Sequence, residues 1–115
     1  MVDFEITADA KEMLKFLYAV YLARRREGKE RTKANNFGTT RDIHNRYFPQ
    51  KSERDVRDIC LELYRAGALL CIRGDNIFFR VRLSDAAIVY GEQNFARNVQ
   101  ALLEWAARVN TAVCL

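Results

Sequence analysis

The chain has 115 residues, of which 50% are hydrophobic and 30% are charged, and it carries a formal net charge of +4. This length and composition indicate one globular domain. They exclude a disordered or fibrous chain and a membrane-spanning stretch of roughly 18 uncharged apolar residues. The acidic start lacks the basic n-region of a signal peptide, which leads us to expect a cytoplasmic protein.

The first predicted helix follows Thr7, which can cap it, and ends near Gly28. Its apolar residues recur at the spacing of one helix face: Leu14, Leu17, Tyr18, Tyr21 and Leu22. Residues 24–33 then hold six basic and two acidic residues. Two interpretations stay open for this segment, a phosphate-binding patch and a helix end followed by a soluble loop. Residues 28–38 are predicted to be a polar loop, with room for a very short strand around Phe37.

Capping signals predict the next two helices. Thr39 and Asp42 have the spacing of a capping box, which predicts a short helix that a proline stops at residue 49. Ser52 and Asp55 repeat this spacing and predict a longer helix over residues 53–66. Two short helices joined by a tight turn are the helix-turn-helix arrangement.

A β-hairpin is predicted next, with strands over residues 69–73 and 77–83 and a turn at residues 74–76. Strand alternation sorts the return strand into two faces. The predicted inward residues are Ile77, Phe79, Val81 and Leu83, and the predicted outward residues are Phe78, Arg80 and Arg82.

A last helix is predicted from Ser84 to about Val109. Its apolar residues recur near heptad spacing, which is typical of a seam for a neighbouring helix. The seam residues are Ile88, Phe95, Val99, Leu102, Ala106 and Val109. We expect a homodimer through this helix, and the alternative is that the helix folds back on the first one.

Two segments carry a family resemblance. Residues 63–70, Leu-Tyr-Arg-Ala-Gly-Ala-Leu-Leu, and residues 81–88, Val-Arg-Leu-Ser-Asp-Ala-Ala-Ile, resemble the entry to and exit from the wing of winged helix-turn-helix regulators of bacterial or phage type. The resemblance covers about residues 39–90 and departs from the usual pattern at Ser84 and Ala87, which replace a threonine and a glycine.

This resemblance implies an α+β, mostly helical, winged helix-turn-helix fold with a long C-terminal helix, in one domain over residues 1–115. Residues 1–38 would form the N-terminal helix and basic loop. Residues 39–83 would form the helix-turn-helix and wing, and residues 84–115 the dimerisation-type helix. The implied function is double-stranded DNA binding by a dimeric transcriptional regulator.

In such a protein, the helix over residues 53–66 reads base edges in the major groove and the wing contacts phosphates. The expected DNA-contacting residues are Thr40, Arg41, Asn45, Lys51, Ser52, Arg54, Arg57, Arg73, Arg80 and Arg82. Arg54 and Arg57 carry the forked donors that match guanine. However, four acidic residues on the same helix oppose a phosphate-lined groove. In the alternative, this face is solvated, with Arg54 paired to Asp58, or it binds a protein.

Other functions have less support in the sequence. A protein-interaction module without DNA binding would use Leu61, Phe78 and the last helix, and a small-molecule sensor would hold a pocket between the first and last helices. The lone histidine, His44, has no paired nucleophile, and the sequence has no phosphate loop or nucleophile elbow, so we expect no enzyme. Three cysteines without metal-binding spacing predict reduced thiols and no metal or other cofactor.

Overall fold

The computed structural model describes residues 2–114, with side chains up to residue 109, so both chain ends of the predicted domain and the side chain of Cys114 lie outside the described part. The fold is α+β and mostly helical, with one two-stranded antiparallel sheet. Its elements are α1 (Ala8–Arg26), α2 (Arg31–Ala34), α3 (Thr40–Tyr47), α4 (Glu53–Arg65), β1 (Leu69–Arg73), β2 (Phe78–Leu83), α5 (Asp85–Asn94), the 3₁₀ helix η1 (Ala96–Asn98) and α6 (Val99–Cys114). Within residues 2–114, no helix is long and apolar enough to cross a bilayer.

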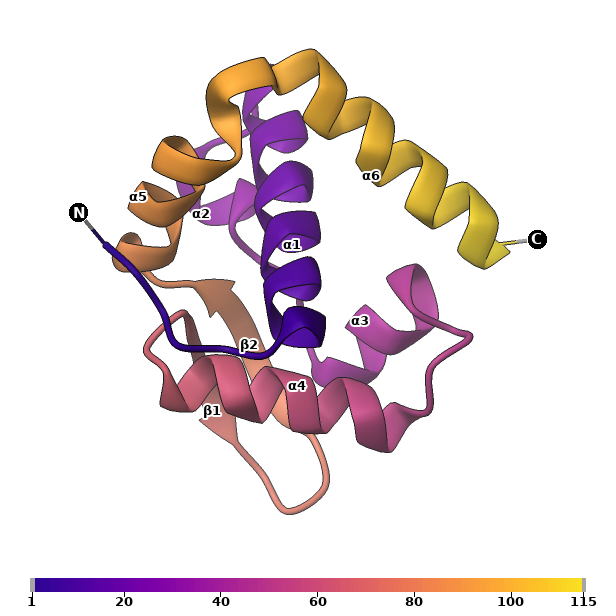
Figure 1. The fold of residues 1–115 in the computed structure, drawn as a ribbon. Coiled ribbons are helices and arrows are strands. Elements are labelled where there is room, and N and C mark those ends of the chain that lie inside the picture. The colour runs from indigo at the N-terminus through magenta and orange to yellow at the C-terminus, as the bar shows by residue number, and fades with distance from the viewer. Residues whose placement is uncertain (1, 115) are drawn as a thin grey trace.

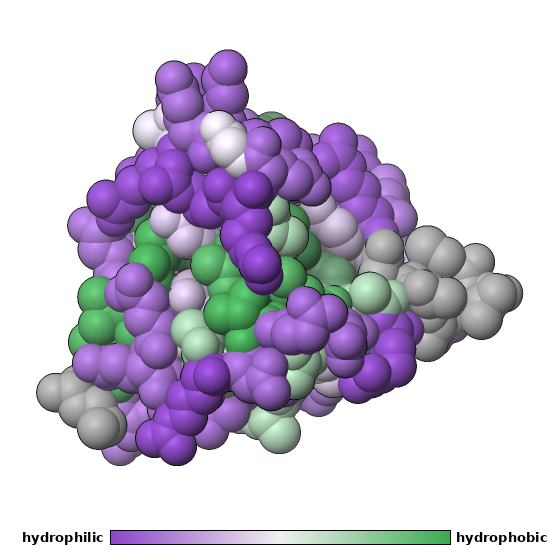
Figure 2. Space-filling view, turned by 90° about the horizontal axis from the view of Figure 1, so that it is seen from above, coloured by the Kyte–Doolittle hydropathy of each residue, from purple (hydrophilic) through white to green (hydrophobic). Residues whose placement is uncertain are grey.

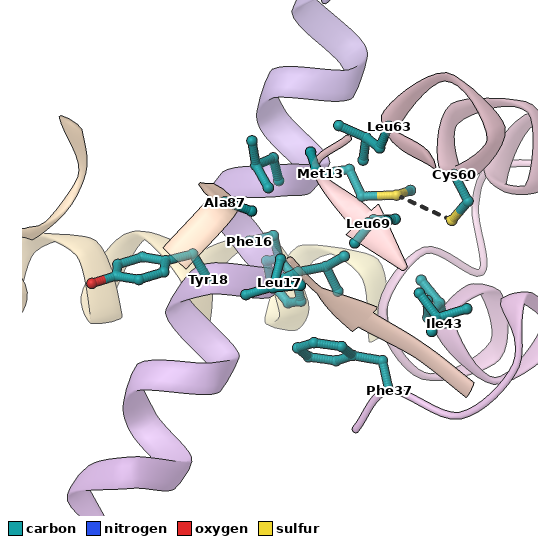
Figure 3. Close-up of a cluster of buried hydrophobic side chains, with 14 of the residues drawn as sticks. Met13, Phe16, Leu17, Tyr18, Phe37, Ile43, Cys60, Leu63, Leu69 and Ala87 are labelled. Atoms are coloured by element: carbon teal, nitrogen blue, oxygen red, sulfur yellow. Dashed lines mark hydrogen bonds between the residues drawn. The ribbon is translucent and has the colours of Figure 1, made fainter. Parts of the chain in front are cut away.

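Helix α1 runs through the middle of the molecule, and the other elements surround it (Figure 1). The Thr7 hydroxyl caps it as predicted, by accepting the N–H of Ala10. Eight of its residues are buried: Ala10, Met13, Leu14, Phe16, Leu17, Tyr18, Ala19 and Tyr21. These side chains meet apolar residues of α3, α4, the hairpin and α5 in a single core (Figure 3). Each large side chain buried in this way contributes about 1.5–3 kcal/mol.

One contact in this core involves a cysteine. The thiol of Cys60 on α4 donates to the Met13 sulfur at 3.7 Å (Figure 3). Burial raises the pKa of this thiol to about 12. Cys60 is therefore a protonated apolar core residue and not a reactive thiolate.

The two capping predictions are confirmed. Thr39 Oγ1 accepts the N–H of Asp42 at 3.1 Å, and Asp42 Oδ2 accepts the N–H of Thr39 at 3.0 Å, which completes the box that starts α3. Ser52 Oγ accepts the N–H of Asp55 at 3.0 Å and starts α4. Gly67 follows α4 with a φ of 83°, the left-handed conformation that glycine adopts readily at a helix end.

The segment predicted as a polar loop is more ordered than expected. It contains α2, and buried Ala34 and Phe37 anchor it to the core. Phe37 lies in no strand, but its N–H donates to the Val81 carbonyl at 3.0 Å, and the Val81 N–H donates to the Gly38 carbonyl at 2.8 Å. These two bonds join the segment to the edge of β2 that does not pair with β1.

The predicted alternation on β2 is wrong at its start. Phe78 is buried, with 4% of its surface exposed, whereas Phe79 is 42% exposed. Val81 and Leu83 are buried as predicted. The pairing register shifts between Leu70 and Ile72, and Arg80 has a φ of 53°. Such a bulge moves residues on one side of it to the opposite face, and no alternation of residue types reveals it.

The prediction of one continuous helix from residue 84 to about 109 is wrong, and so is the long C-terminal helix that it implied. Helix α5 ends at Asn94, η1 turns the chain, and the Asn98 side chain caps α6 by accepting the N–H of Ala101 at 3.0 Å. Figure 2 looks down on the end of the molecule where this turn lies and shows apolar side chains recessed between hydrophilic ones.

The predicted dimer seam therefore does not lie along one helix. Ile88 and Leu102 are buried in the core of this chain, and Phe95 packs on Tyr18 and Tyr90. Val99, Ala106 and Val109 are half-buried. The alternative is observed: α5 and α6 fold back on α1, where Trp105 packs against Phe16.

Gly91 provides a test of this packing. A Cβ on Gly91 would overlap the ring of Tyr18 on α1. Gly91→Ala is expected to lower the free energy of unfolding by about 1–3 kcal/mol, because overpacking outweighs the gain of about 1 kcal/mol in helix propensity. Urea unfolding followed by circular dichroism measures this change, with Glu92→Ala, at an exposed site of the same helix, as control. An unchanged stability would show that α5 does not lie this close to α1.

The capping box predicts a pH dependence. The hydrogen bond from the Thr39 backbone N–H holds the pKa of Asp42 below its ordinary value. The unfolded chain therefore takes up this proton first, so the contribution of the box is complete above about pH 4 and is lost as the pH falls through the lowered pKa. In urea unfolding between about pH 2.5 and 6, Asp42→Asn should lose less stability on acidification than the wild type. Asp75→Asn, in the exposed hairpin turn, should keep the wild-type slope, and equal slopes in all three proteins would contradict this assignment.

Candidate nucleic-acid interface

A polar cleft of about 410 Å³ opens where the starts of α3 and α4 meet the tip of the hairpin. Its lining residues are Thr40, Arg41, Glu53, Arg54, Arg57, Asn76 and Ile77. Three of the seven are arginines, and the partial positive charge of the α4 N-terminus adds to theirs. The cleft therefore favours an anionic partner.

Arg57 and Arg73 lie between α4 and the hairpin. Arg57 Nη1 is 3.4 Å from the Asn76 carbonyl oxygen and 3.5 Å from its side-chain oxygen, a long and weak bond to the tip of the hairpin. The guanidinium of Arg73 lies over the ring of Tyr64, 5.7 Å from its centroid. Tyr64 follows Arg57 by two helical turns, so both arginines lie along the same side of α4.

Arg54 and Arg41 lie further along this side of α4, toward its N-terminus. Arg54 is exposed and forms no ion pair or hydrogen bond with any residue that the structure describes. Arg41 Nε donates to Glu53 Oε1 at 2.8 Å in an exposed pair that contributes little to stability. Four arginines from three elements thus follow one side of α4, and we call Arg41, Arg54, Arg57 and Arg73 the arginine flank.

The four acidic residues of α4 offset the positive charge of this flank only in part. Glu62 is used internally: its carboxylate accepts the N–H of Thr7 at 2.6 Å and the Thr7 hydroxyl at 2.8 Å. Asp55 precedes Glu62 by two turns and shares its side of the helix, away from the hairpin. Asp58 forms an ion pair with Arg57 at 4.0 Å, and the Arg54–Asp58 pair of the solvated-face alternative is not formed. Only Glu53 lies within the cleft, where it pairs with Arg41.

Two of the predicted DNA-contacting residues have structural roles. Thr40 is 4% exposed, and its hydroxyl accepts the buried N–H of Phe78 at 3.2 Å, which corrects the expectation that it contacts DNA. The Ser52 hydroxyl caps α4. At this exposed site, its own O–H and the neighbouring backbone N–H groups can still donate to a phosphate.

His44 fixes the turn between α3 and α4. Its Nε2 is 2.8 Å from the Lys51 carbonyl oxygen, and its Nδ1 is 2.7 Å from the side chain of Asn45. Both ring nitrogens therefore have partners. Asn45 and Lys51, two predicted DNA-contacting residues, lie at this turn beside the start of α4.

Arg80 and Arg82 lie away from the cleft. One hollow beside them is lined by Tyr64, Leu70, Cys71 and Ile72, and another by Thr32, Asn35 and Asn36. Both arginines are exposed, and neither lines the cleft that holds Arg54 and Arg57. The structure thus divides the predicted arginines into two separate groups.

The basic segment of residues 24–33 is largely structural. Arg24 donates to the carbonyl oxygens of Ala34 at 3.3 Å and Asn36 at 2.8 Å, and to the Tyr47 hydroxyl at 3.2 Å. Arg31 pairs with Asp85 at 3.0 Å. These contacts favour the interpretation as a helix end and loop over a phosphate-binding patch. No local pattern in the sequence indicates the partners of Arg24, which are ten or more residues away.

The protein-interaction hypothesis also needs a correction. Phe78, one of its expected anchors, is buried, and Phe79 is the exposed aromatic residue of the hairpin. Leu61 is half-buried and lines a hollow with Glu5 and Arg65. For the sensor hypothesis, a hollow of about 380 Å³ lies between α1 and the joint of α5 and α6. However, the aromatic residues of these helices that could line a ligand pocket lie in the core or pack against it: Phe16, Tyr18, Tyr21, Phe95 and Trp105.

No family model, curated protein or solved structure matches this chain. Function is therefore inferred from the geometry of the arginine flank and of the surfaces around it.

Thr40 distinguishes a structural role from DNA contact. Thr40→Val removes the acceptor of the buried Phe78 N–H and should lower the free energy of unfolding by about 1–3 kcal/mol in urea unfolding. Thr32→Val, at an exposed site on α2, should change it by less than about 0.5 kcal/mol. A Thr40→Val protein of wild-type stability with weakened DNA affinity would instead show that this hydroxyl contacts DNA.

Proposed function

We propose that this protein is a winged helix-turn-helix protein that binds double-stranded DNA and acts as a dimeric transcriptional regulator. In this proposal, α3 and α4 are the helix-turn-helix and the β-hairpin is the wing. Helix α4 enters the major groove, which is wide enough to admit one helix. The order of helices and strands and the antiparallel hairpin are compatible with this fold.

The observation that carries the proposal is the arginine flank. Its members come from α3, α4 and β1, and they lie on the side of α4 opposite Asp55 and Glu62. A strip of arginines with Asp55 and Glu62 on the opposite side gives the helix one orientation in which it meets phosphates most favourably. The other two acidic residues of α4, Glu53 and Asp58, are paired with Arg41 and Arg57, and a phosphate would have to compete with them.

Within the flank, the arginines have different expected roles. Arg54, which has no partner among the described residues, can reach base edges directly. Arg57 would first give up its long bond to Asn76 and its 4.0 Å pair with Asp58. Arg41 and Arg73 lie on either side and would contact phosphates. For Arg41, a phosphate would replace the Glu53 carboxylate, an exchange that costs little because the pair is exposed.

A dimer would place two copies of α4 in successive turns of the major groove, about 34–36 Å apart. The interface for this dimer is not the seam predicted on one long helix, because Ile88 and Leu102 are buried within the chain. Light scattering measures the mass of the free protein and of its complex with DNA, and a monomer in both would contradict the dimeric part of the proposal.

Duplex binding tests the DNA part of the proposal. Fluorescence anisotropy with a mixed-sequence duplex should show binding at low salt, with log K falling linearly as log salt concentration rises. Arg54→Gln/Arg57→Gln should weaken binding about tenfold or more and flatten this salt dependence. Arg80→Gln/Arg82→Gln is the matched control, because it removes the same charge from outside the cleft, and it should retain most of the affinity.

Two outcomes would decide against this assignment. A folded wild-type protein that does not bind duplex DNA even at low salt would overturn the proposed function. Equal losses in the two double variants would show that DNA responds to net charge and not to the arginine flank.

A further inference from the structure

The hairpin carries most of the exposed large hydrophobic side chains that the structure describes. Leu70 is 40% exposed, Ile72 55% and Phe79 42%, and the remaining one, Val89 on α5, is 37% exposed. Cross-strand pairing brings Ile72 beside Phe79 and Leu70 beside Arg82. We call Leu70, Ile72, Phe79, Arg80 and Arg82 the outer hairpin patch.

The backbone of β2 holds this patch in place. Arg80 has a φ of 53°, a left-handed conformation that is unfavourable for a non-glycine residue. The same irregularity places Phe79 on the exposed face and Phe78 in the core. A regular strand would bury Phe79 and expose Phe78, so the bulge decides which of the two aromatic residues is exposed.

We propose that the outer hairpin patch is a docking surface for an extended protein segment that carries apolar and acidic residues on the same face. The patch borders a hollow of about 440 Å³ lined by Tyr64, Leu70, Cys71, Ile72, Arg80 and Arg82. β1 pairs only with β2 among the described strands, so its outer edge is open to strand addition. Apolar side chains of the added segment would cover Leu70 and Ile72, and its carboxylates would reach Arg80 and Arg82.

The composition of the patch favours this occupant over two others. The strand sequences Leu-Leu-Cys-Ile-Arg and Phe-Phe-Arg-Val-Arg-Leu contain no lysine and no acidic residue. Exposed aliphatic and aromatic groups with arginine are typical of the centres of protein interfaces, whereas nucleic-acid interfaces are more polar. A second copy packed face to face would bring arginine against arginine, and such like charges oppose association.

The experiment selects peptides from a phage-displayed random dodecapeptide library on the wild-type protein, after depletion on Phe79→Lys. Enriched peptides are synthesised, and their affinities are measured by fluorescence anisotropy. The matched control is Val89→Lys, which places the same charge at the exposed apolar site outside the hairpin. Circular dichroism checks that each variant is folded, and Ile72→Ser replaces Phe79→Lys if that variant is not.

The proposal expects enriched peptides that combine aspartate or glutamate with apolar residues. Their affinity should fall at least tenfold in Phe79→Lys and in Ile72→Ser and stay unchanged in Val89→Lys. Arg80→Gln/Arg82→Gln should also weaken them and reduce their sensitivity to salt. Failure to enrich any peptide, peptides without acidic residues, or equal losses in Val89→Lys would overturn the proposal.

Two further outcomes would assign the patch to another occupant and so overturn this one. A wild-type dimer that Ile72→Ser or Phe79→Lys converts to a monomer would assign the patch to a second copy. A loss of duplex affinity in Phe79→Ser at low salt, comparable to that of Arg54→Gln/Arg57→Gln, would assign it to nucleic acid.

Discussion

The burial of α1 is the constraint on which the other elements depend. Met13 meets Cys60 of α4, Tyr18 meets Gly91 of α5, and Phe16 meets Trp105 of α6, so three helices take their positions from one. Because α4 directs Val56, Ile59, Cys60 and Leu63 into this core, its opposite side remains exposed. The orientation of the arginine flank thus follows from apolar packing and not from any interaction among the arginines themselves.

Polar contacts then set the position of α3 and the hairpin relative to α4. Thr40 bonds the backbone of Phe78, His44 bonds the carbonyl of Lys51, and Phe37 bonds the carbonyl of Val81. Each of these bonds joins segments that are separate in the chain and satisfies a backbone group near the core, where an unpaired group would be costly. Apolar burial places α4, and these bonds bring Arg41 and Asn76 to the same cleft as Arg54 and Arg57.

The features that sequence predicts well are those with a local cause. Thr39, Ser52 and Gly67 mark helix ends through bonds and angles within a few residues, and the exposed positions of α4 follow from helical spacing. The features that the sequence analysis did not predict have causes distant in the chain. The bulge at Arg80, the break after Asn94 and the burial of Phe37 depend on packing against segments tens of residues away. The heptad spacing of Ile88, Phe95 and Leu102 fitted an intermolecular seam because an intramolecular core needs the same residue types.

The two groups of arginines show why residue type alone does not assign a partner. Arg54 and Arg57 share a polar cleft with Asn76, Thr40 and a helix start, and an anion gains most there from charge and hydrogen bonds. Arg80 and Arg82 lie beside Leu70, Ile72 and Tyr64, and a partner there gains from apolar burial as well. Different elements also position the two groups. Arg54 and Arg57 lie on α4, which packs on α1, whereas Arg80 and Arg82 lie on β2 of the hairpin. The two groups share no arginine, but Arg73 of the flank lies over Tyr64, which lines the hollow of the outer hairpin patch, so a segment added along β1 would border the arginine flank.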